Sequence, residues 1–338
     1  MTKFSWPITG NENRLAELER DLLSDQLSHA YLFAGPPEVG KFTAAKAFAK
    51  FALCANGVCG KCEDCRQIRA NIHPNLTIVD ELWIEGINEN FEAIAKKSNF
   101  NQTHRSRNPK AKTDTIRIED LREILARIHN TRDGRQIFII HNIERLNRES
   151  ANHFLKTLEE PPPRTTFLLT TNNLPLLLPT LVSRCRVLQF GNVNPSAIES
   201  MLSKKFPGLS PDERSRIVNF SMGKPIRAER LAADPDILRE YAEYFRRLKN
   251  LLERPDTADR MTFAEEVTRS TPETQKFLEA FTYFLRSFLL TRARKPIAGS
   301  RYSNEKLVNL LRATNRARSL VVSNVNPRLT VENLLLSI

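Results

Sequence analysis

The pattern of apolar and polar positions differs between the first and the second part of the chain. Up to about residue 190, apolar runs of strand length are separated by segments with apolar residues at helical spacing. The expected strands lie within residues 28–35, 75–80, 135–146, 164–173 and the end of 176–190. The expected helices lie within residues 13–27, 42–54, 116–130 and 150–163. Strands that alternate with helices in this way predict a parallel α/β sheet.

The rest of the chain reads as almost wholly helical from residue 192 onward. We therefore predict an α/β domain followed by two helical domains, at residues 1–190, 191–236 and 237–338. In the last domain, residues 279–290 and 306–322 carry apolar positions at helical spacing, with arginines on the other faces. Some of these apolar side chains must pack inside the domain, and the others are expected to drive assembly with other chains.

The first candidate for chemistry is the stretch GPPEVGKF at residues 35–42. It matches the phosphate-binding loop G-x-x-x-x-G-K-[ST] at all but the last position. Gly35 and Gly40 would let backbone N–H groups converge on phosphates, and Lys41 would neutralise the outer phosphates. An expected strand precedes the stretch and an Ala-rich helix follows it, as the motif requires. The alternative is a glycine-bounded turn that never contacts phosphate.

Magnesium binding is where this loop departs from the motif. Phe42 stands where a Ser or Thr normally gives its hydroxyl to Mg²⁺, and a phenyl ring offers no oxygen ligand. Thr43 carries a hydroxyl, but one residue further along a helix it points about 100° away. The loop thus lacks the expected magnesium ligand.

The second magnesium position of a P-loop ATPase is an Asp at the end of a neighbouring strand, often followed by a catalytic Glu. After the apolar run IFII this sequence has His141 and Asn142, and Glu144 comes three residues too late for the first position. With both positions lost, we predict that the site does not hydrolyse ATP. The retained Lys41 leaves residual nucleotide binding open.

Four of the five cysteines cluster in CANGVCGKCEDC, at Cys54, Cys59, Cys62 and Cys65. This spacing is typical of thiolates that hold tetrahedral zinc. A disulfide does not suit a reducing cytosol, and a redox C-x-x-C usually stands without two further thiols. We predict structural zinc, and four protein ligands would leave no open position for catalysis.

Composition limits the environment and the partners. The chain has 51 Lys and Arg against 39 Asp and Glu, a formal net charge of +12, which suits contact with a polyanion but also a merely solvated basic surface. No apolar stretch approaches the ~18 residues of a membrane span, and no signal peptide is visible, so a cytoplasmic protein is expected.

The polar, basic segment 96–112 is expected to be an exposed loop. Any DNA contact should go through phosphates, because no base-reading helix follows the cysteines.

Taken together, these motifs resemble the delta-prime subunits of the bacterial DNA polymerase III clamp loader, a family with the AAA+ fold. The segments that carry the resemblance are residues 7–41, the cysteine knuckle 54–65, SANHFLKTLEEPPPRTTFLLTT, LPTLVSRC and NVNPRLTVENLLL. They span nearly the whole chain, and the knuckle together with the tripeptide SRC is specific. The related gamma/tau subunits share both features but keep the magnesium hydroxyl and the acidic pair. That departure favours delta-prime over gamma/tau.

The resemblance implies a non-hydrolysing subunit of a five-membered arc that uses ATP to open a sliding clamp and close it on primed DNA. The implied partners are the gamma/tau and delta subunits and, through the complex, the clamp and the DNA; no membrane is involved. The implied fold is an AAA+ P-loop sheet with an inserted zinc knuckle, a helical lid domain and a C-terminal helical collar. The alternative is an ATP-hydrolysing, gamma/tau-like AAA+ clamp-loader ATPase, which ATP turnover by the chain alone would reveal.

The resemblance also assigns roles to single residues. Arg184, the arginine of SRC, would reach a neighbouring subunit's ATP in trans, which suits a planar, permanently charged guanidinium. Thr171 and Asn172 occupy the place of a polar sensor, and Arg227 resembles the lid-domain sensor arginine. The alternatives are an ordinary surface ion pair for Arg184 and a solvated helix charge for Arg227. For Cys185 the alternative to any role is a small buried hydrophobe.

Overall fold

Five strands in the described part of the chain pair in parallel, in the order β2-β3-β4-β1-β5. The structure is a computed structural model. It describes residues 4–54, 59–70, 72–79, 116, 118, 121–122, 125–126, 134–253, 256–294, 302–323 and 325–338. The strands are β1 (Ala30–Ala34), β2 (Leu76–Val79), β3 (Gln136–Ile140), β4 (Thr165–Thr171) and β5 (Arg186–Gln189). Each lies where an apolar run predicts it.

The chain divides into two units by its contacts. Unit 1 is Met1–Gly208 with Gly223–Glu229, and unit 2 is Leu209–Met222 with Arg230–Ile338. The three-domain division predicted from the sequence stays a prediction. The basic segment 96–112 lies outside the described residues, as does most of the helix predicted at 116–130.

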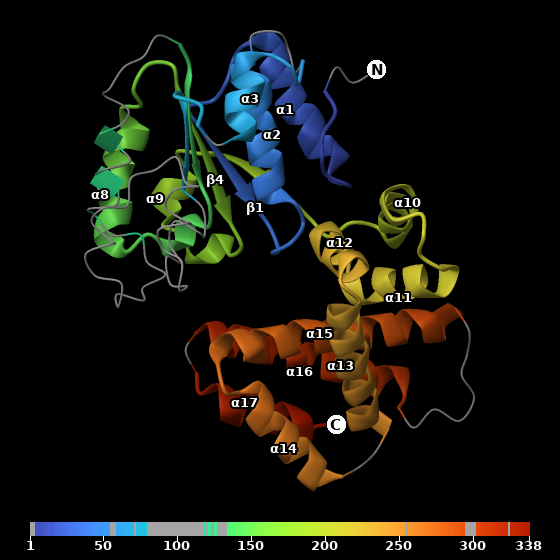
Figure 1. The fold of residues 1–338 in the computed structure, drawn as a ribbon. Helices are drawn as coiled ribbons and strands as arrows, with labels where there is room; N and C mark the ends of the chain where they lie inside the picture. Colours follow the sequence, from blue (N-terminus) through green and yellow to red (C-terminus); the bar gives the residue numbers. More distant parts are fainter. Residues whose placement is uncertain are drawn as a thin grey trace. The chain divides into compact units, whose positions relative to one another are not determined.

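Helices cover both faces of the sheet in unit 1 (Figure 1). One face carries α1 (Glu12–Ser24), α2 (Lys41–Leu53) and α3 (Glu63–Arg69), and the other carries α8 (Arg148–Glu159) and α9 (Pro179–Val182). Unit 1 also contains the short 3₁₀ helices η1 (Ile143–Arg145) and η2 (Leu174–Leu176) and the helix α10 (Pro195–Lys205).

The side chains of β1 show why this strand needs both helical layers. Ala30 and Leu32 belong to the core cluster that includes Phe154 of α8, whereas Tyr31 and Phe33 belong to the cluster that includes Phe48 of α2. Alternate residues of a strand point to opposite faces, and the β1 residues are buried on both. A continuous apolar run, not an alternating one, is therefore the expected pattern for such a strand.

Unit 2 is helical in its described residues. Its helices are α11 (Pro211–Ser221), α13 (Pro235–Glu253), α14 (Thr257–Val267), α15 (Thr271–Arg294), α16 (Asn304–Val322) and α17 (Pro327–Leu336). One further helix, α12 (Pro225–Ala233), contains the boundary between the units. Several helices begin at a proline, whose fixed φ suits the first turn and whose missing N–H costs nothing there. The core gathers around the stacked rings of Phe277 and Phe281.

The carboxyl ends of three neighbouring strands meet at one edge of the sheet. Ala34, the last residue of β1, pairs with Thr171 at the end of β4, and Ile140 of β3 pairs with Leu169 of β4. Parallel α/β sheets bind ligands outside this edge. The predicted parallel α/β sheet and the helical parts that follow it are confirmed.

Candidate functional site

The loop after β1 has the backbone shape that its glycines predict. Gly35 has a φ of +150° and Gly40 a φ of +97°. A Cβ at Gly35 would lie 2.1 Å from the carbonyl oxygen of Phe190, so only glycine fits there. The helix α2 begins at Lys41 with Gly40 as its N-cap, and its first N–H groups have no side-chain cap. The loop and the helix thus have the geometry of a phosphate cradle.

Lys41 is turned back onto this loop. Its side chain is buried, and Nζ donates to the carbonyl oxygens of Gly35 at 2.7 Å and Pro36 at 2.5 Å, and to Oδ1 of Asn172 at 2.9 Å. Burial lowers the pKa of Lys41 to about 8, with Glu144 acting against the shift. The three acceptors satisfy all three ammonium hydrogens, as phosphate oxygens would in a loaded site.

Phe42 and His141, the two residues that the sequence marks as lost magnesium ligands, contact each other. Their ring centroids lie 4.5 Å apart with an interplanar angle of 33°. Nζ of Lys46 lies 5.5 Å from the centre of the Phe42 ring. Thr43, in the first turn of α2, makes no side-chain hydrogen bond with another described residue. Neither ring offers an oxygen ligand to a hard cation.

A network of polar side chains joins the ends of β3 and β4 beside Lys41. Nδ2 of Asn172 donates to Oδ1 of Asn142 at 2.8 Å, and the backbone N–H of Asn172 donates to Glu144 at 2.9 Å. The backbone N–H of Asn142 donates to the buried Thr170 hydroxyl at 2.9 Å. The structure therefore brings the predicted sensor Asn172 to Lys41. Thr171, its neighbour, is fully buried in β4.

Arg227 is buried, so it is not the solvated helix charge weighed as an alternative. Its Nε donates to Oε2 of Glu38 at 2.7 Å, and Nη2 lies 2.5 Å from the same oxygen. The backbone N–H of Ile226 also donates to the carbonyl of Glu38 at 3.2 Å. Glu38 has a φ of +63°, which is unusual for a residue with a side chain. The start of α12 is thus tied to the phosphate-binding loop within unit 1.

The four cysteines of the knuckle lie together at the end of α2 and the start of α3. All four Sγ atoms lie within 4.8 Å of one another, and those of Cys59, Cys62 and Cys65 are 4.0, 3.6 and 3.5 Å from that of Cys54. Thiolates held tetrahedrally at about 2.3 Å from zinc would be about 3.8 Å apart. The thiol cluster therefore fits a zinc ion.

Backbone N–H groups point at these sulfurs. Those of Lys61 and Cys62 donate to Cys59 at 3.5 and 3.1 Å, and that of Cys65 donates to Cys62 at 3.4 Å. The bonds from Lys61 and Cys62 lower the pKa of Cys59 to about 6, whereas burial raises the pKa of Cys65 to about 12. Such N–H bonds stabilise the thiolates that a metal needs.

Arg184 is partly exposed and follows Ser183, the C-cap of α9. Its Nη1 donates to the carbonyl of Thr180 at 2.8 Å, and its Nη2 pairs with Oε1 of Glu159 at 2.7 Å. The surface ion pair weighed as an alternative is thus present, and the role in trans stays a prediction. The adjacent Cys185 packs against the core, and burial raises its pKa to about 12, so it behaves as a small hydrophobe.

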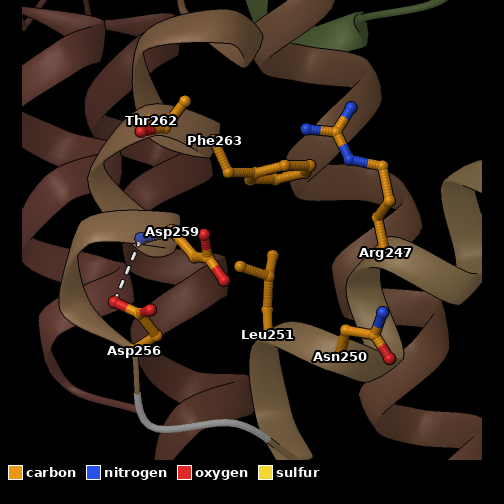
Figure 2. A pocket seen from close by; sticks show the side chains of 7 residues that line it. All are labelled: Arg247, Asn250, Leu251, Asp256, Asp259, Thr262 and Phe263. Atoms are coloured by element: carbon orange, nitrogen blue, oxygen red, sulfur yellow. Dashed lines mark hydrogen bonds between the residues drawn. The ribbon is translucent and has the colours of Figure 1, made fainter.

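A separate pocket of about 230 Å³ lies in unit 2 and contains none of the predicted site residues. Figure 2 shows its lining, with the Arg247 guanidinium beside the Phe263 ring and with Asp256 capping α14. The guanidinium lies 4.9 Å from the ring centre and also pairs with Glu266 at 2.6 Å. Arg247 and Asp256 thus already have partners, in Glu266 and in the first turn of α14.

Two residues of the site escaped sequence reasoning. Glu38 occupies a variable position of the loop motif, so nothing marks it as the partner of Arg227. Glu159 stands in a run of two acids before three prolines, where only the end of a helix can be read. Both contacts depend on how distant segments pack.

In the described residues, no helix combines the length and the apolar character needed to cross a membrane.

Comparison with known proteins gives a match over much of unit 1. The family described as "DNA polymerase III, delta subunit" matches residues 10–194, more than half of the chain. The DNA polymerase III subunit tau/gamma of Haemophilus influenzae is 32% identical over 189 residues, which are 54% of this chain and 23% of that protein. The DNA polymerase III subunit delta' of Pseudomonas aeruginosa is 28% identical over 214 residues, 61% of this chain and 56% of that protein.

Both relatives thus extend well beyond the matched part, since the chain covers less than two thirds of either. Among solved structures, a DNA polymerase III gamma subunit-related protein from Thermotoga maritima is 17% identical. The comparison covers 94% of this chain and 97% of that chain, with a TM-score of 0.46.

Proposed function

The chain belongs to the DNA polymerase III delta subunit family, and on this premise we propose that it is a non-hydrolysing clamp-loader subunit. It helps to load a sliding clamp on primed DNA, with gamma/tau and delta subunits as its partners. Its own phosphate-binding loop keeps the fold but lacks the chemistry of an ATPase. The contribution to hydrolysis is Arg184, supplied to the ATP of a neighbouring subunit.

The contact between Phe42 and His141 carries the proposal. With ring centroids 4.5 Å apart, the two side chains place carbon and imidazole where a P-loop ATPase needs a hydroxyl and a carboxylate. Without Mg²⁺ the charge that develops on the transferring phosphoryl group is not neutralised. The bonds of Lys41 to Gly35 and Asn172 support the same conclusion, because an incoming phosphate must displace them.

We expect the isolated chain to release phosphate from ATP no faster than a protein-free control. The missing magnesium ligands are the reason, and a colorimetric phosphate assay with Mg²⁺ present measures the result. Lys41→Ala serves as the matched variant, since it removes the one cation among loop residues 35–42. Steady phosphate release that Lys41→Ala abolishes would contradict the proposal.

A second candidate function is an ATP-hydrolysing, gamma/tau-like clamp-loader ATPase. The 32% identity to a tau/gamma subunit and the retained Lys41 favour it. It requires magnesium ligands other than Phe42 and His141. The phosphate-release assay separates the two functions, because only this candidate turns over ATP without partner subunits.

In this account the cysteine knuckle binds a structural zinc ion. Four sulfurs at tetrahedral spacing fill the coordination of the ion and leave no position for a water or a substrate. Zinc would tie the end of α2 to the start of α3, which follow each other along the chain. Its contribution is therefore to the local fold of unit 1 and not to catalysis.

The C-terminal helices are proposed to act as the collar that holds the complex together. Leu329 and Leu336 of α17 are exposed, with 58% and 57% of their surface accessible. They are seven residues apart, so they share one face of the helix. Apolar side chains on one helical face are typical of a packing surface for another helix.

We expect the double variant Leu329→Glu/Leu336→Glu to lose most of its co-purification with gamma/tau and delta subunits. Two charges placed in an apolar interface are costly to bury, whereas on the free chain both positions face water. Ser319→Glu, at an exposed position of α16, is the matched control and should assemble normally. Circular dichroism should show unchanged melting for both variants. Normal assembly of the double variant would exclude α17 from the collar interface.

A further inference from the structure

Two acceptors hold the Arg184 guanidinium from two different helices. The carbonyl of Thr180 in α9 accepts from Nη1 at 2.8 Å, and the Glu159 carboxylate at the end of α8 accepts from Nη2 at 2.7 Å. The side chain of Ser183 adds a longer contact at 3.5 Å. The guanidinium is therefore fixed in position and orientation before any neighbouring subunit arrives.

The Glu159 carboxylate, which holds the Arg184 guanidinium, belongs to a helix that is packed into the core. Phe154 and Leu158 of α8 are buried in the core of unit 1, and Asn147 caps the start of the helix. Glu159 is the last residue of α8, where the side chain can reach α9 while its backbone stays in the packed helix. Its place is thus set by the sheet and not by a flexible loop.

This arrangement leaves enough donors for a phosphate. A guanidinium has five N–H groups, and the contacts with Thr180, Ser183 and Glu159 use at most three of them. The remaining donors can fork onto oxygens of a ligand. A long side chain that is already held loses less freedom on binding and meets the reacting group in the correct orientation.

The carboxylate also opposes the positive charge of Arg184, so its net effect depends on which influence is larger. The side chains of Arg184 and Glu159 are 34% and 49% exposed, and water screens a charge pair of that kind. Screening weakens the electrostatic effect but not the geometric one. We propose that Glu159 is a positioning residue that holds Arg184 ready for a neighbour's ATP, an inference that rests on the function proposed above for Arg184.

The test uses the complete complex with gamma/tau and delta subunits and measures kcat and KM for ATP. The loss of kcat caused by Arg184→Ala is the reference. Glu159→Ala should cause at least half of that loss, and the effect should fall on kcat and not on KM. Glu159→Gln keeps an oxygen acceptor and should retain most of the rate. The double variant Glu159→Ala/Arg184→Ala should be no slower than Arg184→Ala alone, because one residue acts through the other.

Glu160→Ala is the matched control, since this neighbouring acid is exposed and pairs with no cation in the described part of the chain. It should turn over ATP like the unmodified complex and melt at the same temperature as Glu159→Ala. A Glu159→Ala complex as fast as the unmodified one, or faster, would overturn the inference while leaving the role of Arg184 intact. If Arg184→Ala is itself without effect, the proposed function fails and the inference fails with it.

Discussion

Arg184→Ala is expected to lower ATP hydrolysis and clamp loading by the assembled complex more than any other single change in unit 1. An arginine supplied to a neighbouring nucleotide is worth roughly 10³–10⁵ in rate in well-studied hydrolases. Only one of several ATP sites in the complex would face this subunit, so the measured loss is diluted by the others. DNA-stimulated phosphate release at saturating ATP is the measurement.

Arg184→Lys should restore little of this rate. An ammonium is a point charge that cannot reproduce the planar fork of a guanidinium. Melting temperature, zinc content and assembly should be unchanged in both variants, because the side chain is partly exposed and contributes little to the core. Full activity of the lysine variant would mean that only charge matters at this position.

Loss of zinc is the second large effect that we expect, and it should be local. In isolated finger peptides, structural zinc is worth on the order of 10–16 kcal/mol at neutral pH. Here two large core clusters of unit 1 gather on the strands of the sheet, and Ile68 is the one buried residue of α3 in them. Cys62→Ser should therefore release the metal and unprotect α3 in hydrogen exchange, while the strands of the sheet stay protected.

Cys62→Ser separates the effect of losing the metal from the effect of losing the helix cap. Cys62 is the N-cap of α3, and serine is also a good N-cap, so the variant keeps the cap and loses the thiolate. Cys185→Ser, outside the cluster, is the control and should keep one zinc per chain. Protein purified without a chelator that contains no zinc by metal analysis would exclude the zinc site.

Much of unit 1 could be predicted from the sequence because its signals are local. The β1 strand is buried on both faces and reads as a continuous apolar run, and the loop that follows is fixed by Gly35 and Gly40. The cysteine spacing within residues 54–65 likewise determines which sulfurs can meet. Such features need only a few neighbouring residues to be recognised.

Contacts between distant segments could not be read in the same way. Glu38 and Arg227 are separated by 189 residues and meet only because α12 packs at the loop of β1. Phe42 and His141 could each be recognised as a lost magnesium ligand, but their ring contact depends on the pairing of the strands. The partner of Arg184, Glu159, was missed for the same reason, since it depends on how α8 lies beside α9.

The central claim is that this chain acts on a neighbour's nucleotide and not on one of its own. Phosphate release by the reconstituted complex, measured in parallel with Lys41→Ala and Arg184→Ala in this chain, tests it most directly. Lys41 already bonds to its own loop, so its removal should change the rate little, whereas Arg184→Ala should lower it strongly. The reverse order, with a crippled Lys41→Ala complex and a fully active Arg184→Ala complex, would contradict the account.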